Sequence, residues 1–235
     1  MRRCLRERPL DTVLPVFELV VFDCDGVLVD SESIAAELEV EMFAEIGMAM
    51  TADEIRARFL GRSPAYMNAA IVEHLGALPD GWEDRWERRY YDALRQQLRP
   101  IDGVAEALDQ ITVPVCVASS SRRASIALKL ELCGLADRFG DRVFSAEQVA
   151  HGKPAPDLFL HAAQELGVTP ARCAVIEDSP VGVQAARAAG MVTFAYAGDG
   201  LVVRDQLEGA RTTVFGDMRE LPALLGAAAR SEPSS

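Results

Sequence analysis

The stretch that decides the fold runs from Phe17 to Leu28 and reads Phe-Glu-Leu-Val-Val-Phe-Asp-Cys-Asp-Gly-Val-Leu. Its apolar residues end abruptly at Asp23 and Asp25, and Gly26 follows them. A short apolar run that stops at a turn signal predicts a strand buried on both faces. Ligands of open α/β sheets gather beyond the carboxyl ends of the strands, so the two aspartates stand where chemistry is expected.

The two aspartates alone permit several interpretations. Side chains alternate along a strand, so Asp23 and Asp25 start on the same side of the chain. A polar turn after a strand is the simplest alternative to a catalytic pair. A calcium loop of the EF-hand type is excluded because the required glycine and distal glutamate are not at the expected spacing. The pair therefore indicates a site only if other segments supply partners.

Length and composition bound the class of protein. The 235 residues are 49% hydrophobic and 26% charged, which is ordinary for a globular chain of one large domain or two unequal ones. The net charge of −12 argues against a surface for nucleic acids or anionic membranes. The basic segment 1–16 has no apolar signal core behind it, and no apolar run reaches the ~18 residues of a membrane span. We therefore expect a cytoplasmic protein with reduced cysteines.

Residues 31–98 carry helix signals and no convincing strand. An apolar stripe with four-residue spacing marks the first helix. Thr51 and Glu54 form a capping box that starts the second. A third helix is expected to run towards Gly76, and a charged fourth helix over 82–98.

From residue 99 onward the pattern changes to alternating strands and helices, which implies a parallel, doubly wound sheet with right-handed crossovers. The first strand and this segment then form one α/β core, and the helical segment is an insertion. The predicted later strands cover 113–118, 142–144, 173–176, 192–196 and 212–215. The predicted division is an N-terminal extension (1–16), the core (17–30 and 99–228), a helical cap (31–98) and a disordered tail (229–235).

Polar groups follow three of the predicted strands. Carboxylates gathered at adjacent strand ends repel one another unless a cation lies among them, and Mg²⁺ prefers oxygen ligands and phosphate oxygens. A phosphorylated substrate is therefore expected, with hydroxyl, backbone N–H and ammonium groups on its phosphoryl oxygens. The groups concerned are Asp23, Asp25, Ser119, Ser120, Ser121, Glu177 and Asp178, with Lys153 in a separate loop.

In this order, four segments resemble the four motifs of the haloacid dehalogenase superfamily. They are Asp23-x-Asp25-Gly26, Ser119, Lys153 in Gly-Lys-Pro-Ala-Pro-Asp, and Glu177-Asp178-Ser179. The resemblance covers residues 17 to about 225, and it implies a Rossmann-like core with an inserted α-helical cap. The subfamily it suggests contains β-phosphoglucomutase, phosphoglycolate phosphatase and small sugar-phosphate phosphatases. The amino-acid sequence around the first motif is similar to that of bacterial phosphatases of the 6-phosphogluconate type.

The resemblance also implies a role for each matched residue. Asp23 would be the nucleophile that forms an aspartyl-phosphate, and Asp25 would serve as general acid and then as general base. Ser119 and Lys153 would stabilise the transferring group, with Ser120 beside them on the phosphate. Asp25 also argues against dehalogenation, because the dehalogenases of this superfamily lack that second aspartate.

The metal and substrate contacts follow from the same resemblance. Mg²⁺ would be held by Asp23, Asp178 and the backbone carbonyl of Asp25, with Glu177 as a further ligand. Arg62, in the cap loop, is expected to contact the substrate. The expected partner is a small phosphorylated metabolite, with no nucleic acid or membrane, and the chain is expected to be a monomer or weak homodimer.

Three alternatives stay open at this point. A mutase of the β-phosphoglucomutase type would have a histidine near Ala35 and an arginine near Pro64, and neither is present. A non-catalytic Mg²⁺-binding scaffold would not need the full set of motif residues. The segment from Cys116 to Arg122 has the Cys-x5-Arg spacing of cysteine phosphatases, but Cys116 lies inside an apolar strand, which favours a buried structural thiol.

Overall fold

The computed structural model describes residues 17–59, 64–198 and 204–231. Its centre is a six-stranded sheet in the order β3-β2-β1-β4-β5-β6, in which every neighbouring pair is parallel. The predicted α/β fold is therefore confirmed. The strands are β1 (Leu19–Phe22), β2 (Val115–Ser119), β3 (Val143–Ser145), β4 (Cys173–Glu177), β5 (Val192–Tyr196) and β6 (Thr212–Phe215).

Helices surround the sheet and build a separate lobe. The four helices of the lobe come from the segment between β1 and β2, and the others belong to the core. They are α1 (Ser31–Glu45), α2 (Ala52–Phe59), α3 (Pro64–Leu75), α4 (Trp82–Gln97), α5 (Val104–Gln110), α6 (Arg123–Leu132), α7 (Ala136–Phe139), α8 (Asp157–Glu165), α9 (Pro180–Ala188), α10 (Arg204–Leu207) and α11 (Leu221–Ser231). Helix α11 runs past the predicted end of the core at residue 228.

Strand β1 is central, with β2 on one side and β4 on the other. The chain winds outward from β1 in both directions, which makes the carboxyl end of β1 the switch point of the sheet. The register pairs Phe22 with Val117 and with Ile176, so the ends of β1, β2 and β4 lie at one edge. The residues that follow these strands are thereby brought together.

The two faces of the sheet have separate hydrophobic clusters. Val20 and Phe22 belong to the cluster covered by α5, α6, α7 and α11, whereas Leu19 and Val21 belong to the one under α8 and α9. All four side chains are fully buried. This two-sided burial explains why the β1 sequence is continuously apolar rather than alternating.

Helix α5 is an element that the sequence patterns did not predict. It has only seven residues and follows Gly103 in a left-handed conformation (φ 78°). Two helical turns are too short for the apolar residues to show a helical repeat, so the sequence pattern of this segment does not distinguish it from a loop. Its apolar side chains nevertheless contribute to the core under β1.

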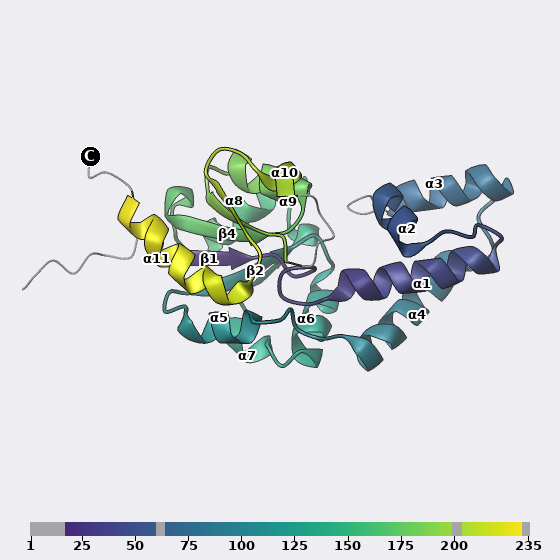
Figure 1. Ribbon diagram of the computed structural model, residues 1–235, viewed down its shortest axis with the longest axis horizontal. Helices are drawn as coiled ribbons and strands as arrows, with labels where there is room; N and C mark the ends of the chain where they lie inside the picture. The colour runs from purple at the N-terminus through teal and green to yellow at the C-terminus, as the bar shows by residue number, and fades with distance from the viewer. Residues whose placement is uncertain (1–16, 60–63, 199–203, 232–235) are drawn as a thin grey trace, which may run out of the picture.

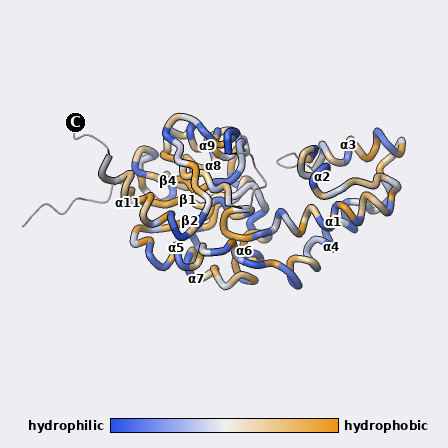
Figure 2. The backbone as a smooth tube through the Cα atoms, viewed as in Figure 1, coloured by the Kyte–Doolittle hydropathy of each residue, from blue (hydrophilic) through white to orange (hydrophobic). Residues whose placement is uncertain are grey.

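The segment from α1 to α4 forms a lobe that projects from the core (Figure 1). It has its own hydrophobic cluster around Met42, Phe43, Ile71 and Trp82. Figure 2 shows that orange, hydrophobic stretches recur along the helices of this lobe. We refer to this lobe as the cap. Its own cluster supports the predicted division of the chain, although the predicted boundaries stay predictions.

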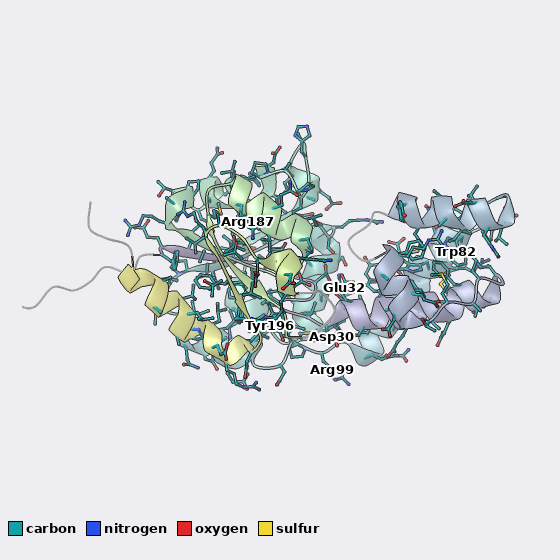
Figure 3. The ribbon with its side chains drawn as sticks, turned by 45° about the horizontal axis from the view of Figure 1, so that its top comes forward. Asp30, Glu32, Trp82, Arg99, Arg187 and Tyr196 are labelled. Carbon is teal, nitrogen blue, oxygen red and sulfur yellow. The ribbon has the colours of Figure 1, made fainter. Side chains whose placement is uncertain are left out.

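Two extended connections join the cap to the core side by side. Val29 bridges Pro100 in antiparallel fashion, and the Asp30 N–H donates to the Arg99 carbonyl at 3.0 Å. Figure 3 places Asp30 and Arg99 together at this junction, with Glu32 on the cap side. Across the described ranges, the helices are too short or too polar to span a bilayer.

The predicted capping box at the start of α2 is confirmed, and a second N-cap starts α9. Thr51 and Glu54 exchange hydrogen bonds at the start of α2, as a capping box does. Ser179 accepts a hydrogen bond from the Gly182 N–H at 3.1 Å, so it caps α9 directly after β4. The Ser179 N-cap of α9 fixes the loop that carries Glu177 and Asp178.

Candidate active site

The end of β1 carries a buried ionic triad. The Lys153 ammonium donates to Asp23 Oδ1 at 2.9 Å and to Glu177 Oε1 at 2.6 Å. The side chains of Lys153 and Glu177 are 3% and 0% exposed. The structure thus brings together residues from β1, from the loop before α8 and from β4, as the order of the motifs predicts.

The electrostatics of this triad are strongly perturbed. Burial raises the pKa of Asp23 to about 7; Lys153 opposes this shift, and the charges of Glu177 and Asp25 add to it. Burial also works against the charged form of Lys153, but Asp23 and Glu177 outweigh it and hold the pKa of Lys153 above its ordinary value. Several carboxylates around one ammonium leave an excess of negative charge, which a further cation would neutralise.

Both carboxylate oxygens of Glu177 accept hydrogen bonds. Its Oε1 accepts from Lys153, and its Oε2 accepts from the N–H groups of Asp178 and Ser179 and from the Ser179 hydroxyl, each at 2.9 Å. A Cβ on Gly182 would overlap this carboxylate, so the glycine makes room for it. Glu177 is therefore placed to fix Lys153 and the β4–α9 loop.

A cluster of three carboxylates lies in position to hold a cation. One ligand oxygen each from Asp23, Glu177 and Asp178 lies within 4.8 Å of the others. The loop after Asp25 packs against this cluster, because Gly26 has a positive φ of 75° and a Cβ there would overlap the Asp178 carboxylate. Oxygen donors gathered in this way fit Mg²⁺ in their chemistry.

Asp25 faces a second, separate set of partners. Its Oδ1 accepts from the Ser31 hydroxyl and the Lys129 ammonium, both at 2.5 Å, and its Oδ2 accepts from the Ser121 hydroxyl at 2.7 Å. Burial favours the neutral acid, but Lys129 and the hydrogen bonds from Ser31 and Ser121 outweigh it and lower the pKa of Asp25. Asp25 is therefore held as a carboxylate.

Lys129 and Ser31 are site residues that sequence reasoning missed, and Ser121 was expected at its strand end but without a contact to Asp25. Lys129 lies on α6, its side chain is 3% exposed, and its ammonium lies 5.7 Å from the centre of the Tyr90 ring of the cap. One signal could have identified it: Lys129 and Lys153 are the only two lysines in the chain, and every other basic side chain apart from histidine is arginine. Both lysines contact aspartates of the first motif.

The remaining predicted site residues have distinct positions. Ser119 is buried at the end of β2, and its hydroxyl accepts from the Ser121 N–H at 3.1 Å, while the exposed Ser120 lines the cleft above it. Arg62 lies outside the described residues. Cys116 is buried within β2, where burial raises the pKa of its thiol. A buried, protonated thiol is no nucleophile, so the cysteine-phosphatase alternative is wrong.

A cleft of about 680 Å³ lies between the cap and the strand ends. Asp25, Ser120 and Lys129 line it from the core, and one face of α1 and of α4 lines it from the cap. Glu39 on α1 lies in this wall and is only 8% exposed. Burial, with repulsion from Glu32 added, raises the pKa of Glu39 to about 7.

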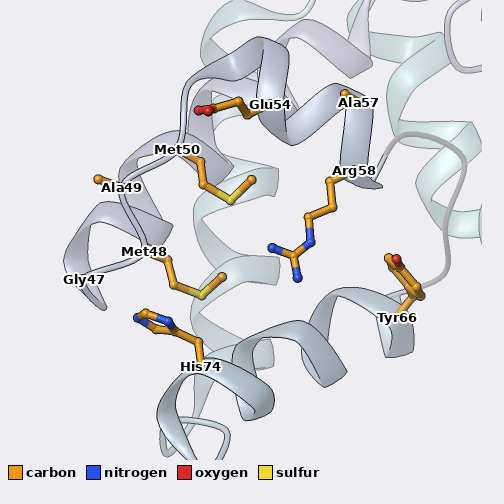
Figure 4. A pocket seen from close by; sticks show the side chains of 9 residues that line it. All are labelled: Gly47, Met48, Ala49, Met50, Glu54, Ala57, Arg58, Tyr66 and His74. Atoms are coloured by element: carbon orange, nitrogen blue, oxygen red, sulfur yellow. The ribbon is translucent and has the colours of Figure 1, made fainter.

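A second cavity, of about 760 Å³, lies within the cap between α2 and α3. Figure 4 shows Arg58 and His74 extending into it, with Met48 and Met50 beside them. None of the predicted catalytic residues in the described ranges lines this cavity. The cleft at the strand ends is therefore the candidate active site.

The raised pKa of Glu39 predicts how stability depends on pH. The ordinary pKa is 4.5 and the folded value is about 7, so between these values the folded chain binds more protons than the unfolded chain. The free energy of unfolding should fall by about 3 kcal/mol as pH rises through this window, and Glu39→Gln should remove that contribution. Denaturant titrations at pH 5 and pH 8 test this, with Glu37→Gln on the exposed side of α1 as control. An equal wild-type-to-variant difference at both pH values would contradict it.

Comparison with known proteins places this geometry in a family context. A family model described as haloacid dehalogenase-like hydrolase matches residues 17–190. The chain is 31% identical to 6-phosphogluconate phosphatase of Escherichia coli over 212 residues, which cover 88% of this chain and 94% of that protein. It is 37% identical over 187 residues to the chloroplastic protein SUPPRESSOR OF QUENCHING 1 of Arabidopsis thaliana, covering 73% of this chain but only 17% of that longer protein.

A solved structure gives the same result at the level of the fold. A conserved haloacid dehalogenase-like protein of unknown function from Agrobacterium tumefaciens superposes with a TM-score of 0.80 at 36% identity. The match covers 91% of this chain and all of that one. The similarity thus includes the cap as well as the sheet.

Proposed function

Because the chain belongs to the haloacid dehalogenase-like hydrolase family and is a phosphoric monoester hydrolase, we propose that it is a Mg²⁺-dependent phosphatase of a small sugar or sugar-acid phosphate. In this proposal the phosphoryl group passes through an aspartyl-phosphate on Asp23. The observation that carries it is the buried triad of Asp23, Lys153 and Glu177 at the switch point of the sheet. A nucleophile beside a fixed ammonium suits attack on an anionic phosphoryl group.

The proposed reaction has two steps. A carboxylate oxygen of Asp23 attacks phosphorus and the bond to the leaving oxygen breaks. Asp25, which first takes up a proton from solvent, gives that proton to the leaving oxygen. Water then attacks the phosphorus of the aspartyl-phosphate and gives a proton to Asp25, which releases phosphate and restores the Asp23 carboxylate. Lys153 and Ser119, with backbone N–H groups near Ser120, hold the phosphoryl oxygens.

The contacts of Asp25 suit the second of these steps. The Lys129 ammonium and the two serine hydroxyls hold Asp25 as a carboxylate. A carboxylate is the form that accepts a proton from water. We assign Lys129 as a positioning residue, because it contacts Asp25 rather than the reacting atoms.

The proposed metal ligands are Asp23 and Asp178, with the backbone carbonyl of Asp25. Glu177 belongs to the same carboxylate cluster, but its oxygens already accept from Lys153 and from the loop after β4, so we assign it to fixing Lys153. Bound Mg²⁺ would supply positive charge to the phosphoryl oxygens and to the Asp23 carboxylate.

Removal of the metal tests this assignment. Exhaustive EDTA treatment should reduce phosphate release to background, because uncompensated carboxylates repel the substrate phosphate. Addition of Mg²⁺ in excess over EDTA should restore turnover, and a mock-treated sample serves as control. Full activity after EDTA treatment, with metal content verified by elemental analysis, would rule out Mg²⁺ dependence.

Phosphatase is favoured over mutase by the cap wall. Ala35 lines the cleft at the position where a mutase of the resembled type would have a histidine. The alanine side chain at this position cannot form a hydrogen bond with a sugar. The proposed contact of Arg62 with the substrate stays a prediction, as do the cytoplasmic location and a monomeric or weakly dimeric state. The scaffold alternative is disfavoured because the chain is a hydrolase of this family.

A further inference from the structure

The cap wall of the cleft carries an excess of carboxylates among its described residues. The two cations among the described residues that line the cleft, both on the core side, are already paired: Lys129 with Asp25 at 2.5 Å, and Arg122 with Glu87 at 3.3 Å. The carboxylates of Glu39, Glu83 and Asp84 add negative charge to the space that the leaving group would occupy.

Glu39 differs from the other carboxylates in this wall. It is the most deeply buried of them, at 8% exposed, and only burial and the charge of Glu32 act on its titration. Among the described residues, no side chain or backbone group donates a hydrogen bond to it. An acceptor that is largely shielded from water and has no protein donor favours a donor from the bound molecule.

Aromatic rings lie in the same wall. The Trp86 ring stacks on the Tyr90 ring at 4.7 Å, and both residues line the cleft. The wall thus combines one carboxylate acceptor with aromatic faces. A hydroxyl group both donates and accepts, whereas a carboxylate only accepts and would meet like charge.

We propose that Glu39 is the specificity-determining residue of the cleft, and that it selects neutral, polyhydroxylated leaving groups and rejects those bearing a carboxylate. The inference rests on the proposed phosphatase function and narrows it from sugar or sugar-acid phosphates to phosphates of neutral sugars and polyols. If Arg62 bound a carboxylate of the substrate, the chain would instead prefer substrates that carry a carboxylate.

Two matched substrate pairs test the proposal. Sorbitol 6-phosphate and 6-phosphogluconate differ only in a terminal hydroxymethyl or carboxylate group, and glycerol 3-phosphate and 3-phosphoglycerate differ in the same way. The wild-type chain should favour the hydroxyl member by at least about tenfold in kcat/KM at pH 8 with Mg²⁺, the factor expected for one like-charge contact in a partly buried site. Glu39→Gln should reduce this ratio about tenfold, mainly through a lower KM for the carboxylate member.

Controls separate this proposal from the proposed function. Glu37→Gln, on the exposed side of α1, should keep the wild-type ratio. Glu39→Ala provides a second neutral variant if the glutamine variant does not fold, as judged by circular dichroism. An equal or inverted wild-type preference, or an unchanged ratio in both folded Glu39 variants, would overturn the proposal.

A generic phosphatase substrate distinguishes failure of the specificity proposal from failure of the proposed phosphatase function. Hydrolysis of p-nitrophenyl phosphate with no turnover of either matched pair would overturn the specificity proposal and leave the phosphatase function standing. No turnover of any phosphate ester, including p-nitrophenyl phosphate, would overturn both.

Discussion

Replacing Asp23 by asparagine is expected to lower kcat by at least about 10⁴-fold, because an amide does not attack phosphorus as a carboxylate does. The fold should survive, and its stability should stay equal or rise. Burial makes the charge of Asp23 unfavourable and raises its pKa to about 7, so a neutral side chain of the same shape relieves that cost. Steady-state phosphate release and thermal melting of the same preparation measure the two effects.

A matched control makes the Asp23 result specific. Asp92→Asn removes an exposed carboxylate that pairs with Arg95 on α4, away from the strand ends. It should change neither kcat nor the melting temperature appreciably, because exposed pairs contribute about 0–1 kcal/mol. Substantial turnover by purified, folded Asp23→Asn would reject the assignment of the nucleophile.

Lys129→Met is expected to have the second largest effect. The substitution keeps a long apolar side chain but removes the ammonium that lies 2.5 Å from Asp25. Asp25 would then remain buried with only serine hydroxyls, and leaving one charge of a buried pair unmatched costs about 3–5 kcal/mol. The proton-transfer role of Asp25 should also suffer, with kcat lower by about 10²-fold.

The Lys129 prediction needs a control for simple loss of an ion pair. Arg138→Met removes the cation of a surface pair with Asp109, in which both side chains are more than 40% exposed. This control should lose less than about 1 kcal/mol and keep its kcat. A Lys129→Met variant that is less stable but turns over normally would show that the residue serves the fold alone.

The strand ends were predictable because their signals are local. A buried strand is continuously apolar, so the first polar residues after β1, β2 and β4 marked the catalytic edge without knowledge of the fold. Lys153 was placed by its motif, and the structure puts its ammonium between Asp23 and Glu177. The parallel, doubly wound arrangement of the strands followed from the alternation of strands and helices, whereas the order of the strands was not predicted.

The contacts of Asp25 were not predictable from local patterns. Lys129 lies in the last turn of α6, where a single lysine is usually a solvated surface residue. Only the packing of α6 beside β1 and under Tyr90 turns its ammonium towards Asp25. The position of Glu39 on a helix is local information in the same way, but its burial depends on how α1 and α4 face the core.

Phosphorus NMR of the wild-type chain with β-glucose 1-phosphate and Mg²⁺ tests the central claim most directly. A phosphatase breaks the ester and transfers the phosphoryl group to water, whereas a mutase returns it to the sugar. Ala35 in the cap wall offers no hydrogen bond that would keep the sugar in place for return. We predict that the signal of inorganic phosphate grows without accumulation of glucose 6-phosphate. Accumulation of glucose 6-phosphate with little inorganic phosphate would contradict the assignment.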